Sequence, residues 1–109
     1  MAALRDLDAG AWRGLPLDAV PPGDLTRWLA DPTHPAPGGE SVADVVARVG
    51  AWLAAPARRL AVITHPAVLR AALVHALSAA DQSFWRIDVA PGAQLVLRGG
   101  PGRWTALFR

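Results

Sequence analysis

Cysteine, lysine and tyrosine are all missing from this 109-residue sequence. A chain without cysteine forms no disulfide and holds no thiolate nucleophile, and the zinc-ribbon and zinc-finger classes are excluded as well. Because those three residue types are missing, nothing titrates between histidine and arginine. The isoelectric point is therefore high although the formal net charge is only +2. It is no sign of a basic binding surface.

Long apolar runs and basic stripes are missing too. Arg70, His75 and several prolines interrupt the apolar stretches, whereas a helix needs about 20 apolar residues to cross a bilayer. The arginines are scattered singly except for the pair at 58–59, without the interleaved aromatics of a nucleic-acid surface. Residues 1–6 contain no apolar signal-peptide core. We expect no membrane partner, no nucleic-acid partner and a cytoplasmic location.

Apolar residues, in contrast, make up 52% of the chain, and only 18% of the residues are charged. This balance is typical of a globular domain rather than a disordered segment. The length suffices for one small hydrophobic core, and the sequence has no internal repeat. We therefore treat residues 1–109 as a single domain.

The clearest helical pattern covers residues 42–54. Ser41 is its expected N-cap and Asp44 stands three residues later, which is close to a capping box. Pro56 ends the helix. Its apolar stripe consists of Val42, Val45, Val46, Val49, Trp52 and Leu53.

Two further helices are predicted. Residues 24–30 form a short helix with Asp24 as its N-cap. Residues 66–78 form another, which begins at Pro66 because proline suits the first turn of a helix. The expected buried face of this second helix is Val68, Leu69, Ala72, Leu73, Ala76 and Leu77.

The strand predictions complete an α/β fold. Residues 59–64 are apolar and rich in β-branched side chains, which indicates a buried strand. Residues 93–98 and 103–108 flank a Gly-Gly-Pro-Gly turn and are expected to pair as a hairpin. Shorter strands are expected over 1–8 and 84–89. Strands alternating with helices in this order favour a three-layer α/β/α arrangement with a C-terminal hairpin.

His65 is the most informative single residue. It stands where the predicted strand 59–64 meets the start of the helix 66–78. Ligands of open α/β sheets bind at the carboxyl ends of strands, and a helix N-terminus offers free N–H groups to an anion such as phosphate. His65 is therefore a candidate anion-binding residue; the alternative is a histidine that only ends a strand.

Carboxylates provide the other candidates. Asp6 and Asp8 lie close together before a glycine loop, where burial of one could raise its pKa and make it a general acid; otherwise both are solvated. Glu40, the only glutamate, precedes the helix 42–54, and the dipole of that helix favours a carboxylate at this end. His34 is expected to be exposed and His75 structural. The histidines have no metal-ligand spacing, so we expect no metal site.

Several segments together resemble the histidine phosphatase superfamily, the phosphoglycerate-mutase-like proteins. Residues 4–14 (LRDLDAGAWRG) resemble the family's L-x-E-x-x-x-G-x-W-x-G segment. Residues 37–41 (PGGES) match its P-G-G-E-S segment, and Asp44 and Arg48 follow at the expected places. Residues 62–65 (VITH) are similar to its V-x-T-H strand end, and the terminal hairpin also fits. The resemblance covers nearly the whole chain.

The resemblance implies a two-step phosphoryl transfer without a cofactor, on a phosphorylated small molecule. A histidine in an Arg-His-Gly motif takes the phosphoryl group, a second histidine stabilises its charge, and a carboxylic acid protonates the leaving oxygen. By position, His65 is the second histidine, and Asp6 replaces the usual glutamate as the acid. Glu40, Ser41 and Thr64 belong to the matched segments and are the candidate substrate-binding residues.

The sequence also departs from the family. It contains no Arg-His-Gly motif, and Pro66-Ala67 stand where glycines usually follow the second histidine. Proline removes one N–H that would otherwise face an anion. The resemblance therefore implies an incomplete domain, the C-terminal part of the family's α/β/α sandwich.

We favour a truncated or degenerate phosphatase-like protein that is inactive as this chain. One alternative is a binding module that forms a homodimer through the unpaired edge of the strand 59–64. Another is an active phosphatase completed by a missing N-terminal segment. His65 itself is a poor candidate nucleophile, because the sequence offers no neighbouring arginine and histidine to activate it.

Overall fold

The computed structural model of this chain describes residues 2–54 and 65–109. Three α-helices, four short 3-10 helices (η) and two strands are found in these two ranges. In chain order they are η1 (Ala2–Leu4), η2 (Gly10–Trp12), η3 (Leu17–Ala19), α1 (Pro22–Ala30), α2 (Val42–Leu53), α3 (Pro66–Ala76), η4 (Asp81–Arg86), β1 (Leu95–Arg98) and β2 (Thr105–Phe108). The predicted strand 59–64 lies outside the described residues.

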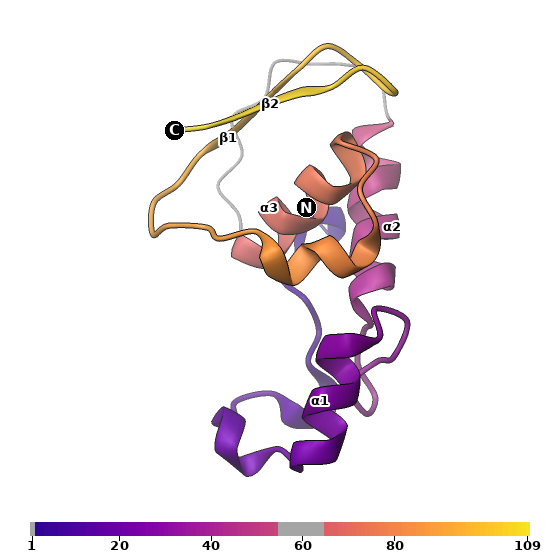
Figure 1. Cartoon of the computed structure of the whole chain (residues 1–109), viewed down its shortest axis with the longest axis vertical. Helices are drawn as coiled ribbons and strands as arrows, with labels where there is room; N and C mark the ends of the chain where they lie inside the picture. The colour runs from indigo at the N-terminus through magenta and orange to yellow at the C-terminus, as the bar shows by residue number, and fades with distance from the viewer. Residues whose placement is uncertain (1, 55–64) are drawn as a thin grey trace.

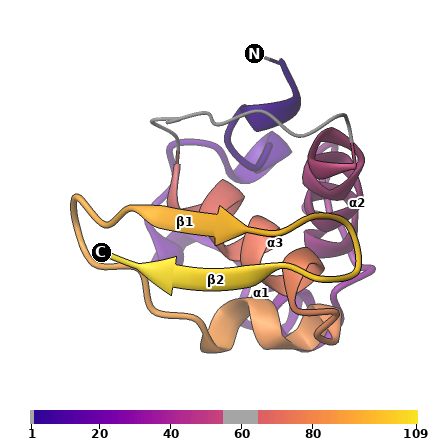
Figure 2. The same ribbon diagram turned by 90° about the horizontal axis from the view of Figure 1, so that it is seen from above.

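The elements are spread along one long axis, with extents of 42 × 25 × 23 Å. Figure 1 shows the hairpin at one end, α2, α3 and η4 in the middle, and α1 with the neighbouring turns at the other end. From above, the hairpin lies over α3 (Figure 2). No helix in the described ranges has the length and apolar character needed to span a bilayer.

Helix α2 confirms its prediction. The Ser41 hydroxyl accepts a hydrogen bond from the Asp44 N–H at 3.1 Å, and the Asp44 carboxylate accepts one from the Ser41 N–H at 2.9 Å. This capping box satisfies two N–H groups that have no partner within the helix. The buried stripe is the predicted one: Val42, Val45, Val46 and Val49 are buried, and Trp52 and Leu53 pack at its edge.

Helix α3 begins at Pro66 as predicted, ends at Ala76 and buries part of the predicted face. Val68, Ala72 and Ala76 are buried as expected, whereas Leu77, just beyond the helix, is 54% exposed. Ala71 and Val74, which were not on the predicted face, contact the core instead. The helix is apolar on most of its circumference, so its periodicity did not define which side faces α2.

The core lies mainly between α2 and α3, and Phe84 of η4 closes it. Phe84 is completely buried, and Leu4 of η1 joins the same cluster. Gly50 allows a close approach of the two helices, since a Cβ there would lie 2.5 Å from Nδ1 of His75. His75, predicted to be structural, is exposed overall with its ring against this glycine.

Helix α1 begins two residues earlier than predicted. Pro22 takes its first turn, Pro21 is the N-cap, and Asp24 lies inside the first turn rather than at the cap. The fixed φ of proline is already helical, which explains the earlier start. Trp28 of α1 stands edge-on to Trp12, with ring centroids 6.0 Å apart, and meets Trp85 of η4 at 4.9 Å. These ring contacts connect α1 and η2 to η4.

Two predicted strands are wrong. Residues 1–8 contain the turn η1 instead, because the Arg48 side chain takes up backbone carbonyls that a strand would have used in a ladder. Residues 84–86 are instead the second half of η4, and no strand follows them over 87–89. Phe84 points into the core, and the Ile87 carbonyl accepts a hydrogen bond from Arg70 Nε at 2.8 Å. Neither arrangement leaves a ladder for a partner strand.

The C-terminal hairpin is confirmed. β1 and β2 are antiparallel, with Leu95 opposite Phe108 and Arg98 opposite Thr105. Among the described residues these two strands form the whole sheet. A two-stranded ribbon is only marginally stable alone, so its packing on α3 contributes to its stability.

Candidate functional site

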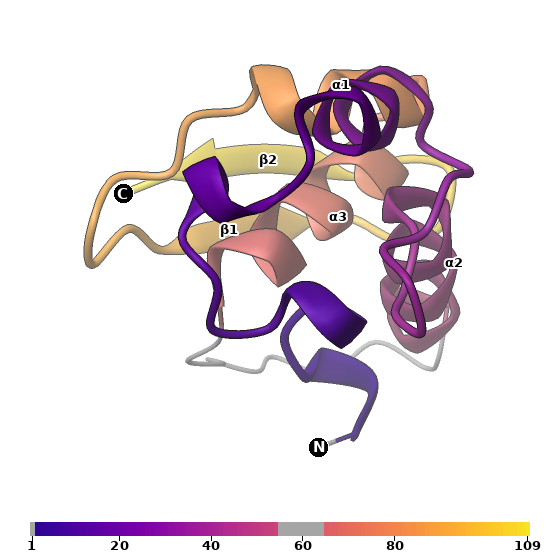
Figure 3. The same cartoon turned by 90° about the horizontal axis from the view of Figure 1, so that it is seen from below.

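The site is built where two loops meet backbone to backbone. The Ala11 N–H donates to the Pro37 carbonyl at 2.8 Å, and the Glu40 N–H donates to the Asp8 carbonyl at 2.8 Å. Between these bonds Gly10 faces Gly39. A Cβ at Gly39 would lie 2.4 Å from the Asp8 carbonyl oxygen, so the approach needs glycine. Segments resembling two separate family motifs are thus joined into one unit by backbone hydrogen bonds. Figure 3 shows the arrangement of α1, α2 and the N-terminal end of the chain from below.

Glu40 is the centre of this unit. Its Oε1 accepts hydrogen bonds from the Asp8 N–H and from Arg48 Nη2, both at 3.0 Å. Its Oε2 accepts from Arg48 Nε at 3.1 Å and lies 3.5 Å from Arg5 Nη2. The Glu40 and Arg48 side chains are only 14% and 13% exposed. A two-pronged pair of this kind fixes direction as well as distance.

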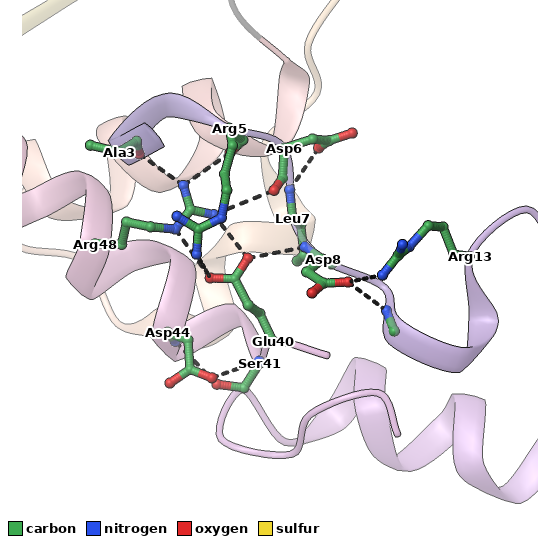
Figure 4. Close-up of polar contacts among 11 residues, drawn as sticks. Ala3, Arg5, Asp6, Leu7, Asp8, Arg13, Glu40, Ser41, Asp44 and Arg48 are labelled. Atoms are coloured by element: carbon green, nitrogen blue, oxygen red, sulfur yellow. Dashed lines mark hydrogen bonds and ion pairs between the residues drawn. The ribbon is translucent and has the colours of Figure 1, made fainter. Parts of the chain in front are cut away.

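The remaining N–H groups of Arg48 hold the N-terminal segment (Figure 4). Nη1 donates to the carbonyls of Ala3 and Arg5 at 2.8 and 2.9 Å. Nη2 reaches the Asp6 carbonyl at 3.5 Å. The backbone of this segment therefore faces Arg48 while the Asp6 side chain points away from it.

The Asp6 side chain meets His65. Asp6 Oδ2 lies 3.7 Å from His65 Nδ1, and Asp6 Oδ1 accepts a hydrogen bond from the Leu7 N–H at 2.8 Å. Both side chains are more than half exposed, at 58% and 56%. The two residues predicted from separate motifs are therefore neighbours across 59 positions of sequence and open to solvent.

His65 is the N-cap of α3 but its side chain makes no capping hydrogen bond. Its carbonyl accepts from the N–H groups of Val68 and Leu69 at 3.0 and 3.2 Å. Pro66 occupies the first helical position and has no N–H to offer an anion. The imidazole thus stands at the positive end of the α3 dipole with its ring free to turn toward solvent or Asp6.

Asp8 is held by its own loop. Its Oδ1 accepts hydrogen bonds from the Gly10 N–H and from Arg13 Nη2, both at 2.9 Å. The Gly10 N–H first and the Arg13 guanidinium second lower the pKa of the Asp8 carboxyl below its usual range. Asp8 therefore stays ionised and shapes the loop, and of the two neighbouring aspartates only Asp6 faces His65.

The predicted substrate-binding residues lie apart from this pair. The Ser41 hydroxyl is buried and engaged in the capping box, and the Glu40 carboxylate is engaged by Arg48. Their role toward a substrate stays a prediction. Thr64 lies outside the described residues. His34 is half-buried rather than exposed, and the described ranges hold no cluster of three or more possible metal ligands.

Arg48 is the functional residue that the sequence reasoning passed over. Only the resemblance placed it, and the residue pattern gave no partner for it. One signal was present: the only glutamate of the chain lies eight positions before Arg48, just before the N-cap of the same helix. The residue pattern gave no sign either that Gly10 and Gly39 each face the other's backbone.

Comparison with known proteins connects this geometry to a family. A sequence model of the histidine phosphatase superfamily (branch 1) matches residues 1–108. A solved structure named "Mycobacterial hydrolase 1" superposes with a TM-score of 0.72 and 25% identity, and its fold supports the α/β class predicted here. The match covers 100% of this chain and 61% of that one, so the chain spans about three fifths of its length. No curated protein matches the sequence.

Proposed function

The chain belongs to branch 1 of the histidine phosphatase superfamily, and from that premise we propose that residues 1–109 supply one half of a site for phosphomonoester hydrolysis. In this half, Asp6 is the acid that protonates the leaving oxygen. His65 is the second histidine, which stabilises charge on the phosphoryl group during transfer. The substrate class is a phosphorylated small molecule.

One observation carries the proposal, the 3.7 Å approach of Asp6 Oδ2 to His65 Nδ1 at the N-terminus of α3. A leaving oxygen next to both groups would find a proton source on one side and a cationic or hydrogen-bonding partner on the other. The exposure of both side chains leaves room for a substrate.

The other half is the nucleophile. The family's reaction, as the resemblance implies it, begins on the histidine of an Arg-His-Gly motif, and this sequence has none. Removing a covalent nucleophile costs several orders of magnitude in rate because little more than binding and electrostatics remains. We therefore propose that the chain is inactive until a segment bearing that motif completes it, in the same polypeptide or from a partner.

Phosphatase assay of the purified chain tests the proposal directly. We expect no turnover of p-nitrophenyl phosphate above the buffer rate by residues 1–109. His65→Ala and Asp6→Asn are the matched controls, because contaminating activity would survive both. Clear turnover that His65→Ala abolishes would overturn the proposal.

The encoding reading frame and the intact mass of the native protein decide between completion and degeneration. An in-frame extension that encodes a strand ending in Arg-His-Gly, joined to this chain, should turn over phosphomonoesters and lose that activity with either Asp6→Asn or His65→Ala. A native protein whose mass equals that of residues 1–109, with no partner that carries an Arg-His-Gly motif, would indicate a degenerate relative.

Homodimerisation is the second candidate role. Its proposed surface, the edge of residues 59–64, lies outside the described part of the chain, so it depends on the sequence pattern alone. Sedimentation of the purified chain, combined with titration of inorganic phosphate, separates the two roles. A stable dimer without phosphate affinity would favour a binding module over half of a hydrolytic site.

A further inference from the structure

The Arg48 guanidinium joins α2 to the stretch of chain that precedes Asp6. Its Nη1 donates to the Ala3 and Arg5 carbonyls at 2.8 and 2.9 Å, and its Nη2 approaches the Asp6 carbonyl at 3.5 Å. Three carbonyls within four residues that meet one cation fix the local backbone direction. The Asp6 Cα–Cβ bond is therefore directed by Arg48, although the two side chains do not meet (Figure 4).

Glu40 fastens the stretch that follows Asp6. Its carboxylate accepts the Asp8 N–H at 3.0 Å and its own N–H donates to the Asp8 carbonyl at 2.8 Å. These two hydrogen bonds between the same two residues fix the backbone of Asp8 against Glu40, much as paired residues are held in an antiparallel sheet. Asp6 is therefore anchored on both sides, by Arg48 before it and by Glu40 after it.

Helix α2 also fixes the position of His65. Arg48 belongs to α2, and α2 packs on α3 through buried valines and alanines. His65 is the N-cap of α3. Asp6 and His65 are therefore connected through the Arg48 side chain, helix α2 and the interface of α2 with α3. The close packing of that interface limits how far the two residues can move apart.

From these contacts we propose that Arg48 and Glu40 are positioning residues that set the Asp6 carboxylate against His65. The inference deepens the proposed function and rests on it for the role of Asp6. Neither Arg48 nor Glu40 touches the substrate in this account. Each acts through the backbone on either side of the acid.

We call the clamp the contacts of Arg48 with Glu40 and with the backbone carbonyls before Asp6. Its chemistry requires arginine. The planar guanidinium offers five N–H donors in a fixed fork, and here they are divided between one carboxylate and a row of carbonyls. Lysine would keep the charge but offers three donors on a flexible stem and no fork. Arg48→Lys therefore keeps the positive charge but removes the planar fork of donors. Glu40→Gln keeps the shape of the side chain but removes its negative charge.

A cross-linking experiment reports the position of Asp6 without depending on activity. The chain has no cysteine, so Asp6→Cys with His65→Cys introduces the two thiols of the full chain. Dibromobimane bridges neighbouring thiols and becomes fluorescent once both have reacted. The rate of the second, ring-closing step relative to the first measures how well the two positions are held together.

We expect Arg48→Lys to slow ring closure roughly tenfold, because effective concentration falls steeply when a group is no longer oriented. Glu40→Gln should slow it as well, and it decides the matter if Arg48→Lys fails to fold by circular dichroism. Val20→Ala is the matched control: it shortens a buried side chain, 4% exposed, that belongs neither to the clamp nor to the core between α2 and α3, and it lowers stability. Its closure rate should be unchanged.

The inference would be overturned if the folded clamp variants closed the ring as fast as the chain that carries only Asp6→Cys and His65→Cys. So would an equal slowing by Val20→Ala, because the effect would then be general loosening. Failure of the proposed function has a different signature, which is phosphatase turnover by residues 1–109. The two readouts are independent, since the cross-linking chain lacks both proposed catalytic side chains.

Discussion

Gly39 has no space for a side chain. A Cβ there would lie 2.4 Å from the Asp8 carbonyl oxygen and 2.8 Å from the Gly10 nitrogen, and both are backbone atoms that cannot swing aside. Gly39→Ala should therefore push the two loops apart and lower the free energy of unfolding by about 1–3 kcal/mol. Urea denaturation followed by tryptophan fluorescence measures the change.

Gly23 provides the control for this substitution. It lies in α1, and a Cβ there would meet nothing within 4 Å. Gly23→Ala should leave stability unchanged or raise it by up to about 1 kcal/mol, because alanine loses less conformational entropy in a helix. Equal stability of Gly39→Ala and Gly23→Ala would mean that the loops do not meet as described.

Asp8 makes the stability depend on pH. The Gly10 N–H and then the Arg13 guanidinium lower the pKa of its carboxyl, so the folded state favours the ionised form. The contribution is fully present above the unfolded pKa of about 3.9 and is lost as the pH falls through the lower folded value. Asp8→Asn should therefore be less stable than the unmodified chain at neutral pH, by an amount that shrinks below about pH 4.

Thermal unfolding across this pH range tests the Asp8 prediction. Asp18→Asn, which changes an exposed aspartate of η3, is the matched control for the loss of one negative charge. A stability difference for Asp8→Asn that is constant with pH would show that the carboxylate's charge does not contribute.

Residue by residue, the sequence predicts the site unevenly. The sequence singles out His65 and Asp6 as candidates through motif order, and the structure places the two side chains together. The contact between Glu40 and Arg48 is not predictable, because a single ion pair between residues eight positions apart leaves no periodic signal. The same pair of side chains also explains why the strand expected over 1–8 is missing, since Arg48 binds the carbonyls it would need.

Between elements, the contact of α2 with α3 depends on a notch at Gly50. A Cβ there would lie 2.5 Å from Nδ1 of His75. Gly50→Ala should lower the free energy of unfolding by about 1 kcal/mol in the unmodified chain, since the ring or the helix must move. In a His75→Ala background the same change should raise it by about 1 kcal/mol, because the notch is empty and alanine favours the helix.

A double-mutant cycle in urea measures this reversal of sign. The singly substituted His75→Ala chain is the reference for the second arm. If Gly50→Ala stabilises the chain with His75 present, the ring turns away at little cost and the notch does not determine the helix contact.

The elements differ in how much of them the sequence predicts. α2 is predicted in full because its cap, its stripe and its stop signal agree. The start of α3 is predicted, but its end comes two residues early and its buried face is predicted only in part, since its apolar residues surround the helix. The segment expected as a strand at 84–89 was misread because its apolar residues fit either a strand or a turn, and burial of Phe84 decided for the turn.

For the whole molecule, the class of fold is predictable and the arrangement is not. Alternating strand and helix signals were enough for α/β, which the structural match supports. The position of α1 at one end of the molecule is accompanied by aromatic contacts of its Trp28 with Trp12 of η2 and Trp85 of η4, which no local pattern contains. The hairpin is the exception, because its turn residues are adjacent in sequence.

The reach of the Arg48 side chain has a consequence for the order of folding. Arg48 binds carbonyls 43 and 45 positions earlier in the chain. Closing a loop of that size costs entropy before its contacts are made, so such contacts form slowly. During synthesis the segment around Asp6 leaves the ribosome long before its anchor exists. It cannot be held in place until α2 has formed, so Asp6 reaches its position only after nearly half of the chain has been made.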